Sequence, residues 1–253
     1  MRMADLAFTE YEALVREKSP IVVIPCGALE QHGPHLPLAT DAMIPTMLAE
    51  RFVPAFGGIV APTFTYGVRS QPKSGGGNHF CGTTSLWGST YALMVADIVE
   101  EFGRHGVKKI VMLDGHTENQ PFLVEGVERA LVNLRRDGIT DVRVIRLAYY
   151  MAIDAKLQAT LFPDGLLSWD LEHAAVMETS VMMALSPSHV RLDRIPDDPP
   201  ADFPIYETFP IDPAPIPCHG VLSSAKSATA EKGRAVVDTL VAEFSDLIPR
   251  AFR

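Results

Sequence analysis

Short segments rich in β-branched residues alternate along this chain with longer segments whose apolar residues recur every three or four positions. The first kind predicts buried strands at 21–25, 59–62, 109–113 and 142–147. The second kind predicts helices at 41–52, 89–105, 120–137, 177–185 and 229–252. Because parallel strands need crossover connections, this alternation predicts an α/β fold, a mostly parallel sheet flanked by helices on both faces. Side chains that follow the strands are then expected to meet at the carboxyl edge of the sheet.

The length of 253 residues lies at the upper end for a single domain, and we expect one domain covering 1–253. A formal net charge of -9 opposes binding to nucleic acid and to anionic membranes. The chain contains no apolar run of membrane-spanning length, and its N-terminal segment is charged. We therefore expect a cytoplasmic protein. The three scattered cysteines, Cys26, Cys81 and Cys218, are predicted to be free thiols.

Eight prolines fall between positions 195 and 217. This density excludes a helix or a central strand, because proline removes a backbone donor and fixes its own backbone angle. We expect the segment to wrap the surface of the protein or a neighbouring subunit.

Four side chains of metal-ligand type follow the first predicted strand within twelve residues, namely Glu30, His32, His35 and Asp41. Glu30 and His32 are two positions apart, so on an extended segment both face one side. A polar turn with a helix-capping aspartate is the alternative for any one residue, but the set favours a metal site, with His35 as a bystander.

A second cluster, Asp114, His116 and Glu118, follows the predicted strand at 109–113. Both clusters end strands of one sheet, so we expect them to meet in a single site, although Asp114 followed by glycine is also ordinary turn chemistry. Histidine and carboxylate ligands without thiolate suit zinc or manganese. About five ligands exceed the need of one tetrahedral catalytic ion, which favours two.

A third cluster, at the start of the helix predicted at 177–185, contains Trp169, Asp170, Glu172, His173 and Glu178. His173 is a candidate for proton transfer, whereas the two glutamates are equally consistent with a solvated helix face. The glycine-rich run at 73–85 lacks the ending of a phosphate loop, and its successive glycines favour close approach of the backbone to a ligand or a subunit contact.

The runs GALEQHGPHLPLATD, SQPKSGGGNHFCGTTSL, DGHTEN and WDLEHAAVMETS closely resemble the corresponding segments of the creatininase family. The resemblance extends from about residue 11 to residue 232. It implies a homohexameric hydrolase with two divalent ions, zinc and/or manganese. By this resemblance Glu30, Asp41 and His116 hold one ion, and His32, Asp41 and Glu118 hold the other.

The resemblance also implies that a metal-activated hydroxide opens the lactam ring of creatinine to give creatine. Three further roles follow for the catalytic candidates: His173 delivers the proton, Glu172 faces the amidine part of the substrate, and Glu118 acts at the metals. The substrate pocket is then lined by Ser74, Thr117, Tyr150, Trp169 and Asp170.

Two positions depart from the family pattern. Thr117 stands where creatininase has a tyrosine, and Tyr150 corresponds to a tryptophan that covers the substrate. These changes leave open another substrate, such as a different small cyclic amide, a formamide or a cyclic ketone. A non-catalytic metal-binding scaffold is a further alternative.

Overall fold

Four short strands form a single parallel sheet in the order β2-β1-β3-β4. Their bounds are Ile21–Cys26 (β1), Ile59–Val60 (β2), Lys109–Asp114 (β3) and Arg143–Ala148 (β4) in a computed structural model that describes all 253 residues. In register, Ile21 pairs with Lys109 and Cys26 with Asp114, so β1 and β3 end at the same level. The parallel sheet that the sequence predicts is therefore confirmed.

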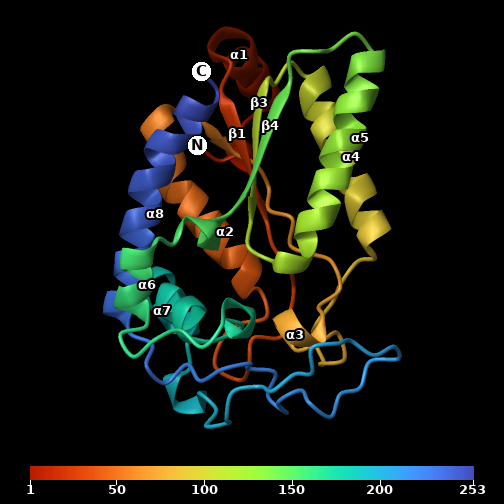
Figure 1. Cartoon of the computed structure of the whole chain (residues 1–253). Helices are drawn as coiled ribbons and strands as arrows, with labels where there is room; N and C mark the ends of the chain where they lie inside the picture. The colour runs from red at the N-terminus through yellow and green to blue at the C-terminus, as the bar shows by residue number, and fades with distance from the viewer.

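Eight α-helices connect and cover the strands. They are α1 (Phe8–Lys18), α2 (Thr40–Phe52), α3 (Pro72–Gly75), α4 (Gly88–Arg104), α5 (Gln120–Arg136), α6 (Ala155–Leu161), α7 (Val176–Leu185) and α8 (Ala230–Ala251). Figure 1 shows α4 and α5 side by side on one face of the sheet, with α2 and α8 on the other and α7 below them. Helices on both faces were expected from the sequence.

Alternate residues of the strands enter two separate cores, because successive side chains of a strand point to opposite faces. Val23, Val111 and Leu113 pack with the fully buried side chains of α2 and α8, including Phe52 and Phe244. The residues between them pack against α4 and α5. This burial on both faces explains why the strands read as continuous apolar runs.

The five helices expected from apolar spacing are all present, with ends that differ by a residue or two. The Thr229 hydroxyl accepts the Lys232 N–H at 3.2 Å, which caps α8 and explains its start at Ala230. Three helices, α1, α3 and α6, were not predicted. They are short, and α1 buries only Val15, so their apolar periodicity is weak.

The proline-rich segment at 195–217 contains neither helix nor strand, as its composition predicts. All three cysteines are free, with Cys26 buried and the other two exposed. None of the helices combines the length and the apolar character needed to cross a membrane.

Candidate metal centre and its pocket

The loops that follow β1 and β3 bring their polar side chains together, as expected at the carboxyl edge of the sheet. The Nδ1 atom of His116 lies 3.2 Å from a carboxylate oxygen of Glu30 and 3.0 Å from one of Asp41. Asp41 comes from the first turn of α2, which approaches the loop after β3 closely. A methyl group at Gly115 would collide with the carbonyl oxygen of Asp41 and press on the Pro45 ring, so this approach requires a glycine.

The first group of possible metal ligands is Glu30, Asp41 and His116. The carbonyl oxygen of Val68 lies 2.9 Å from Nε2 of His116. Since a carbonyl oxygen only accepts, Nε2 carries a proton and Nδ1 can present its lone pair to the two carboxylates. Burial alone would lower the pKa of His116, but the nearby carboxylates of Glu118 and Glu30 raise it well above its ordinary value. The three side chains therefore need a cation between them, either a proton or a metal ion.

The second group is His32, Asp41 and Glu178. Nδ1 of His32 donates to the backbone carbonyl of Glu30 at 3.1 Å, which leaves Nε2 with its lone pair. This Nε2 lies 3.0 Å from the second oxygen of Asp41 and 3.7 Å from Glu178, yet it is buried and forms no hydrogen bond. The two oxygens of Asp41 thus face different groups, and a carboxylate in this position can bridge two ions.

The residues present fit a pair of divalent cations. Three carboxylates are buried together, with 2% of Glu30, 3% of Asp41 and 6% of Glu178 exposed, and no lysine or arginine lines the pocket to balance them. Burial raises the pKa of Glu30 to about 8, and one of its carboxylate oxygens has no hydrogen-bond partner. Oxygen and imidazole donors without thiolate are the set that zinc and manganese share.

The ligand role that the resemblance gives to Glu118 stays a prediction. In the structure Glu178 is the carboxylate that groups with His32 and Asp41. Glu118 instead accepts hydrogen bonds from the Ser74 hydroxyl at 2.5 Å and from the backbone N–H of Gln71 at 2.9 Å. It also lies 3.5 Å from Nε2 of His116, so it stays at the edge of the first group.

His173 is held by Gln31, a residue that sequence reasoning did not single out. The side-chain amide of Gln31 donates to the carbonyl oxygens of Gly75 at 3.0 Å and Gly220 at 2.9 Å, which uses both of its hydrogens. Its backbone oxygen, 2.9 Å from Nε2 of His173, then accepts the proton of that nitrogen. Nδ1 of His173 is left as a free base. Gln31 gave no signal in the sequence beyond its place between Glu30 and His32.

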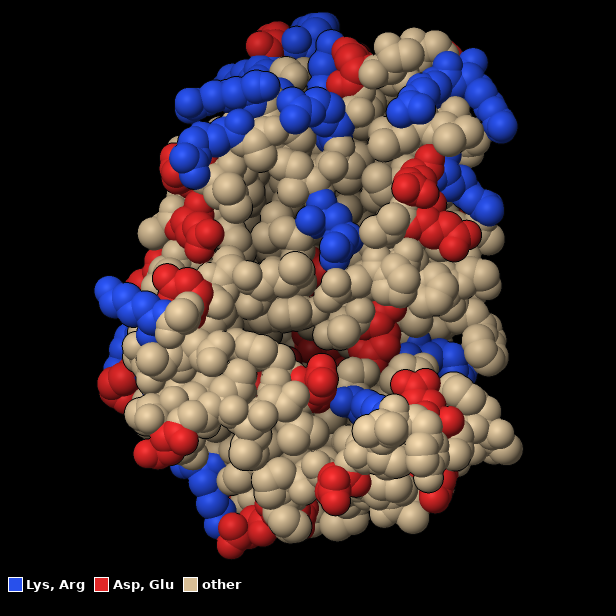
Figure 2. Space-filling view, in the orientation of Figure 1, with Lys and Arg blue, Asp and Glu red and all other residues tan.

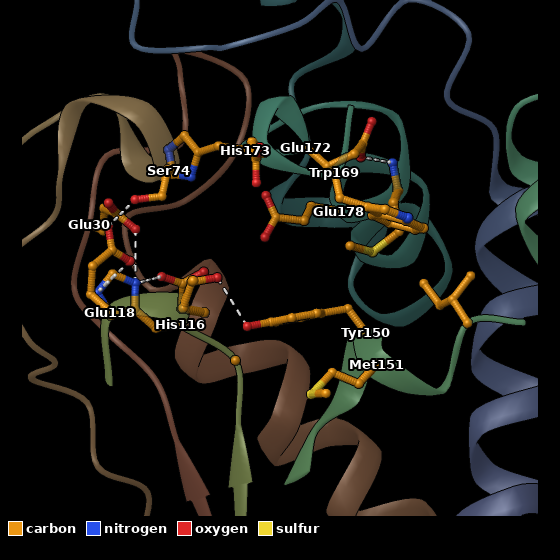
Figure 3. A pocket seen from close by; sticks show the side chains of 16 residues that line it. Glu30, Ser74, His116, Glu118, Tyr150, Met151, Trp169, Glu172, His173 and Glu178 are labelled. Carbon is orange, nitrogen blue, oxygen red and sulfur yellow. Dashed lines mark hydrogen bonds and ion pairs between the residues drawn. The ribbon is translucent and has the colours of Figure 1, made fainter. Parts of the chain in front are cut away.

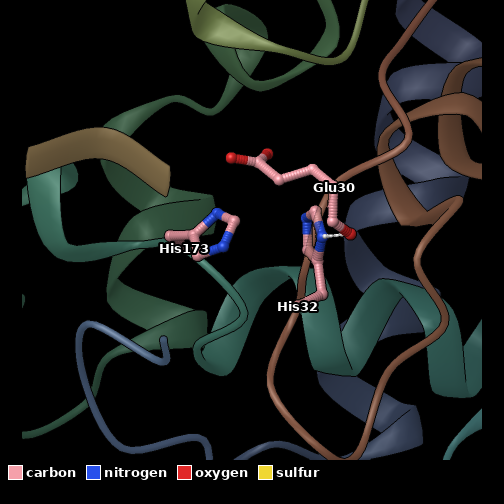
Figure 4. A group of neighbouring side chains, drawn as sticks. All are labelled: Glu30, His32 and His173. Atoms are coloured by element: carbon pink, nitrogen blue, oxygen red, sulfur yellow. Dashed lines mark hydrogen bonds between the residues drawn. The ribbon is translucent and has the colours of Figure 1, made fainter. Parts of the chain in front are cut away.

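The environment keeps His173 neutral. Burial is the main cause that lowers the pKa of His173 to about 3, and the neighbouring His32 adds to it. The rings of His32 and His173 are 4.4 Å apart, and Figure 4 shows His173 facing both His32 and Glu30. His173 also groups with Glu30 and His32 as a possible ligand, and as a neutral imidazole it has a lone pair that can accept a proton.

A pocket of about 370 Å³ opens over these groups. Of the residues in the sequence clusters, His32, His35 and Asp114 do not line it; the lining includes Glu30, Asp41, Ser74, His116, Thr117, Glu118, Tyr150, Trp169, Asp170, Glu172 and His173. Figure 2 shows carboxylate side chains inside a recess of the surface, and Figure 3 shows Glu118 and His116 opposite Glu178 and Trp169 across it. Met151, Ile153 and Met177 add an apolar wall that the sequence did not indicate.

The two positions that depart from the family pattern contact each other. The hydroxyl of Tyr150 lies 3.0 Å from that of Thr117 and accepts a hydrogen bond from Gln120 at 2.6 Å. Tyr149, by contrast, is only 1% exposed and lies outside the pocket lining. Tyr150 is therefore the aromatic side chain that this part of the chain presents to a ligand.

Two residues near the centre do not join it. His35 is buried and pairs with the Thr179 hydroxyl at 3.0 Å. One carboxylate oxygen of Asp114 accepts the backbone N–H of His116 at 3.2 Å and the Asn119 side chain at 3.1 Å. Neither belongs to a ligand group, and Asp114 instead orders the loop that carries His116.

The glycine-rich run makes the close approach that the sequence suggested. A methyl group at Gly75 would collide with the carboxylate of Glu30 and the hydroxyl of Ser70. The backbone at this position therefore forms part of the wall around the first ligand group, and no larger residue fits there.

Curated proteins similar to this chain include a creatinine amidohydrolase and, at 31% identity, a mycofactocin precursor peptide peptidase of Mycolicibacterium smegmatis. The family model for creatinine amidohydrolase (creatininase) matches residues 4–248. The creatinine amidohydrolase of Pseudomonas putida is 46% identical over 251 residues, which cover 99% of this chain and 96% of that one. A solved creatininase described as the Mn form superposes with a TM-score of 0.97 at 46% identity, covering 99% of this chain and 98% of that chain. A creatininase mutant complexed with creatine gives a TM-score of 0.96 at 45% identity with the same coverage.

Proposed function

The chain belongs to the creatininase family, and from this premise we propose that it is a two-metal amidohydrolase that opens the lactam ring of creatinine to give creatine. The observation that carries the proposal is the position of Asp41, whose two oxygens face separate histidine and carboxylate groups at the floor of the pocket. The pocket volume of about 370 Å³ leaves room for a small ring.

Glu30 and His116 would hold one ion and His32 and Glu178 the other, with Asp41 shared. The protein's contribution is to fix the lone pairs of both histidines through backbone carbonyls, at 2.9 Å for His116 and 3.1 Å for His32. Two divalent ions bound there, zinc or manganese, would supply an activated water and positive charge for the oxyanion of the transition state.

His173 would carry the proton. Ring opening breaks the bond between the carbonyl carbon and a ring nitrogen, and water contributes OH to the carbon and H to the nitrogen. The free Nδ1 of His173 takes up the proton of the attacking water, and the imidazolium then releases it to the departing nitrogen. The hydrogen bond to the carbonyl of Gln31 at 2.9 Å keeps the ring in one tautomer and one orientation throughout.

The remaining pocket residues would bind and orient the substrate. Tyr150 and Trp169 offer aromatic surface to a planar ring, and Thr117 fixes the Tyr150 hydroxyl. One carboxylate oxygen of Glu172 accepts the Met177 N–H at 2.9 Å, and we assign the other to the amidine part of the substrate. Ser74 and Asp170 complete the rim of the pocket, where Ser74 also holds Glu118.

The second candidate is hydrolysis of another small cyclic amide, a formamide or a cyclic ketone at the same centre. It is favoured by the pairing of Thr117 with Tyr150, because these two residues stand where the family pattern has a tyrosine and a tryptophan. If Thr117→Tyr raised creatinine turnover from negligible to readily measurable, the second candidate would be the better account. A metal-binding scaffold would be inert toward all of these substrates.

The setting of the enzyme is also part of the proposal: one metallohydrolase domain over 1–253, assembled as a homohexamer in the cytoplasm. The family match over 4–248 supports one domain. Exposed apolar side chains in the proline-rich segment, with Ile205 fully exposed and Phe209 75% exposed, support burial against other subunits. Light scattering after size-exclusion chromatography measures the number of subunits.

Creatine formation from creatinine, measured in a coupled assay on protein reconstituted with zinc and manganese, tests the reaction. A Glu118→Gln variant serves as the control, because it removes a pocket carboxylate and keeps the side-chain shape. The proposal expects turnover by the parent protein and its loss in the variant. No turnover by protein with two bound ions would reject creatinine as the substrate.

A further inference from the structure

Three donors of different chemistry meet on the surface outside the pocket. The Sγ atom of Cys218 lies 3.3 Å from Nδ1 of His219, and the same Nδ1 lies 2.7 Å from a carboxylate oxygen of Asp198. Their donor atoms all fall within 4.8 Å of one another. None of the three residues lines the catalytic pocket or has a role in the proposed reaction.

The backbone brings these donors together. Gly220 N–H donates to the Pro217 carbonyl at 2.8 Å, which closes a turn with Cys218 and His219 at its two central positions. The Ala201 N–H donates to the Leu222 carbonyl at 2.9 Å, which ties the segment of Asp198 to the segment after the turn. The two ends of the proline-rich loop are therefore already adjacent, and little further ordering is needed for all three donors to act together.

The geometry does not suit a cysteine nucleophile activated by histidine. Such a relay needs the thiol on one imidazole nitrogen and the carboxylate on the other. Here both partners address Nδ1, and the second nitrogen, Nε2, lies 4.0 Å from the sulfur. Donors that converge on one side of a ring are instead the arrangement of a metal site, in which one ion replaces the hydrogens between them.

We propose that Asp198, Cys218 and His219 bind a thiophilic divalent cation of the zinc type, with water in the fourth position. One sulfur, one nitrogen and one oxygen donor suit zinc, whereas manganese prefers ligands without sulfur. The exposure of His219 (47%) and Asp198 (33%) leaves the site open to solvent. The site stands apart from the proposed hydrolysis and does not depend on it.

A cation at this position clips the two ends of the loop that carries the exposed Ile205 and Phe209. It also stiffens the turn next to Gly220, whose carbonyl accepts the Gln31 amide at 2.9 Å. The clip thus connects a surface ion to the residue that holds His173.

Cysteine alkylation separates this site from the catalytic centre. Manganese-loaded protein is treated with iodoacetamide with and without added zinc, and each modified cysteine is quantified by peptide mass spectrometry. We expect zinc to slow alkylation of Cys218 about tenfold or more, because a coordinated thiolate is not free to react. Cys81 is exposed and belongs to no such group, so its rate serves as an internal control and stays unchanged.

Two variants extend the test. Asp198→Asn and His219→Asn should each weaken the protection of Cys218, while His105→Asn, which changes an exposed histidine elsewhere, should leave it intact. An unchanged rate at Cys218 in the parent protein overturns the proposal. So does equal slowing at Cys81, or protection that persists in both variants of the site.

Discussion

Glu178→Gln separates the ligand set proposed from the structure from the set that the resemblance implied. The side-chain oxygen of glutamine can still accept the Ala174 N–H, which Glu178 now does at 2.6 Å, so the hydrogen bond just before α7 is kept. The variant loses only the charge that faces His32, 3.7 Å away. Its effect should therefore fall on metal binding and leave the fold intact.

The expected loss can be scaled from known metal sites. Removal of residues that only orient a ligand weakens metal binding about 10- to 100-fold, and loss of a direct ligand should reach at least the upper value. A 100-fold change corresponds to about 2.8 kcal/mol. We expect the second ion to dissociate from Glu178→Gln during dialysis against a metal buffer that keeps two ions on the parent protein.

Plasma mass spectrometry of dialysed protein measures the bound equivalents, with thermal unfolding as the check on folding. Glu118→Gln is the matched control, since it removes a carboxylate from the same pocket and should retain both ions while losing turnover. Two equivalents on Glu178→Gln together with one on Glu118→Gln would refute the ligand set proposed from the structure.

Three further changes have defined outcomes. Gly75→Ala should cost most of the bound metal and the turnover, because the added methyl group displaces Glu30; metal content and far-UV circular dichroism check this. Thr117→Val should raise KM for creatinine about tenfold or less with little change in kcat, since it frees the Tyr150 hydroxyl without altering the metals; an unchanged KM would show that this contact does not shape the pocket. Burial raises the pKa of Glu172 from 4.5 to about 8, so its contribution to stability is present below the unfolded value and is lost as pH rises through the folded one. Urea titrations of metal-free protein measure the free energy of unfolding at each pH. Glu172→Gln should reduce its fall with pH by up to about 1.4 kcal/mol per pH unit, and an equally steep fall in variant and parent would contradict this.

The sheet and most of the helices could be predicted because their signals are local. Val22 and Val23 enter opposite cores, so the strand reads as a continuous apolar run, and the register that follows puts the loops after β1 and β3 side by side. Glu30 and His116 could be placed together on this ground alone.

The position of Glu178 beside His32 could not be predicted from local sequence patterns. Its carboxylate reaches His32 only because α7 packs against α2 and α8, and nothing in the spacing around residue 178 reports that packing. The surface cluster with Asp198 and Cys218 was not predicted for a similar reason. These two residues lie 20 positions apart and are brought together by a turn and one backbone hydrogen bond.

Anomalous diffraction from crystals of protein loaded with zinc and manganese would locate the catalytic ions directly. Two peaks are expected, one beside Glu30 and His116 and one beside His32 and Glu178, with Asp41 between them. A single peak at the centre, or a second ion held by Glu118 in place of Glu178, would contradict the account.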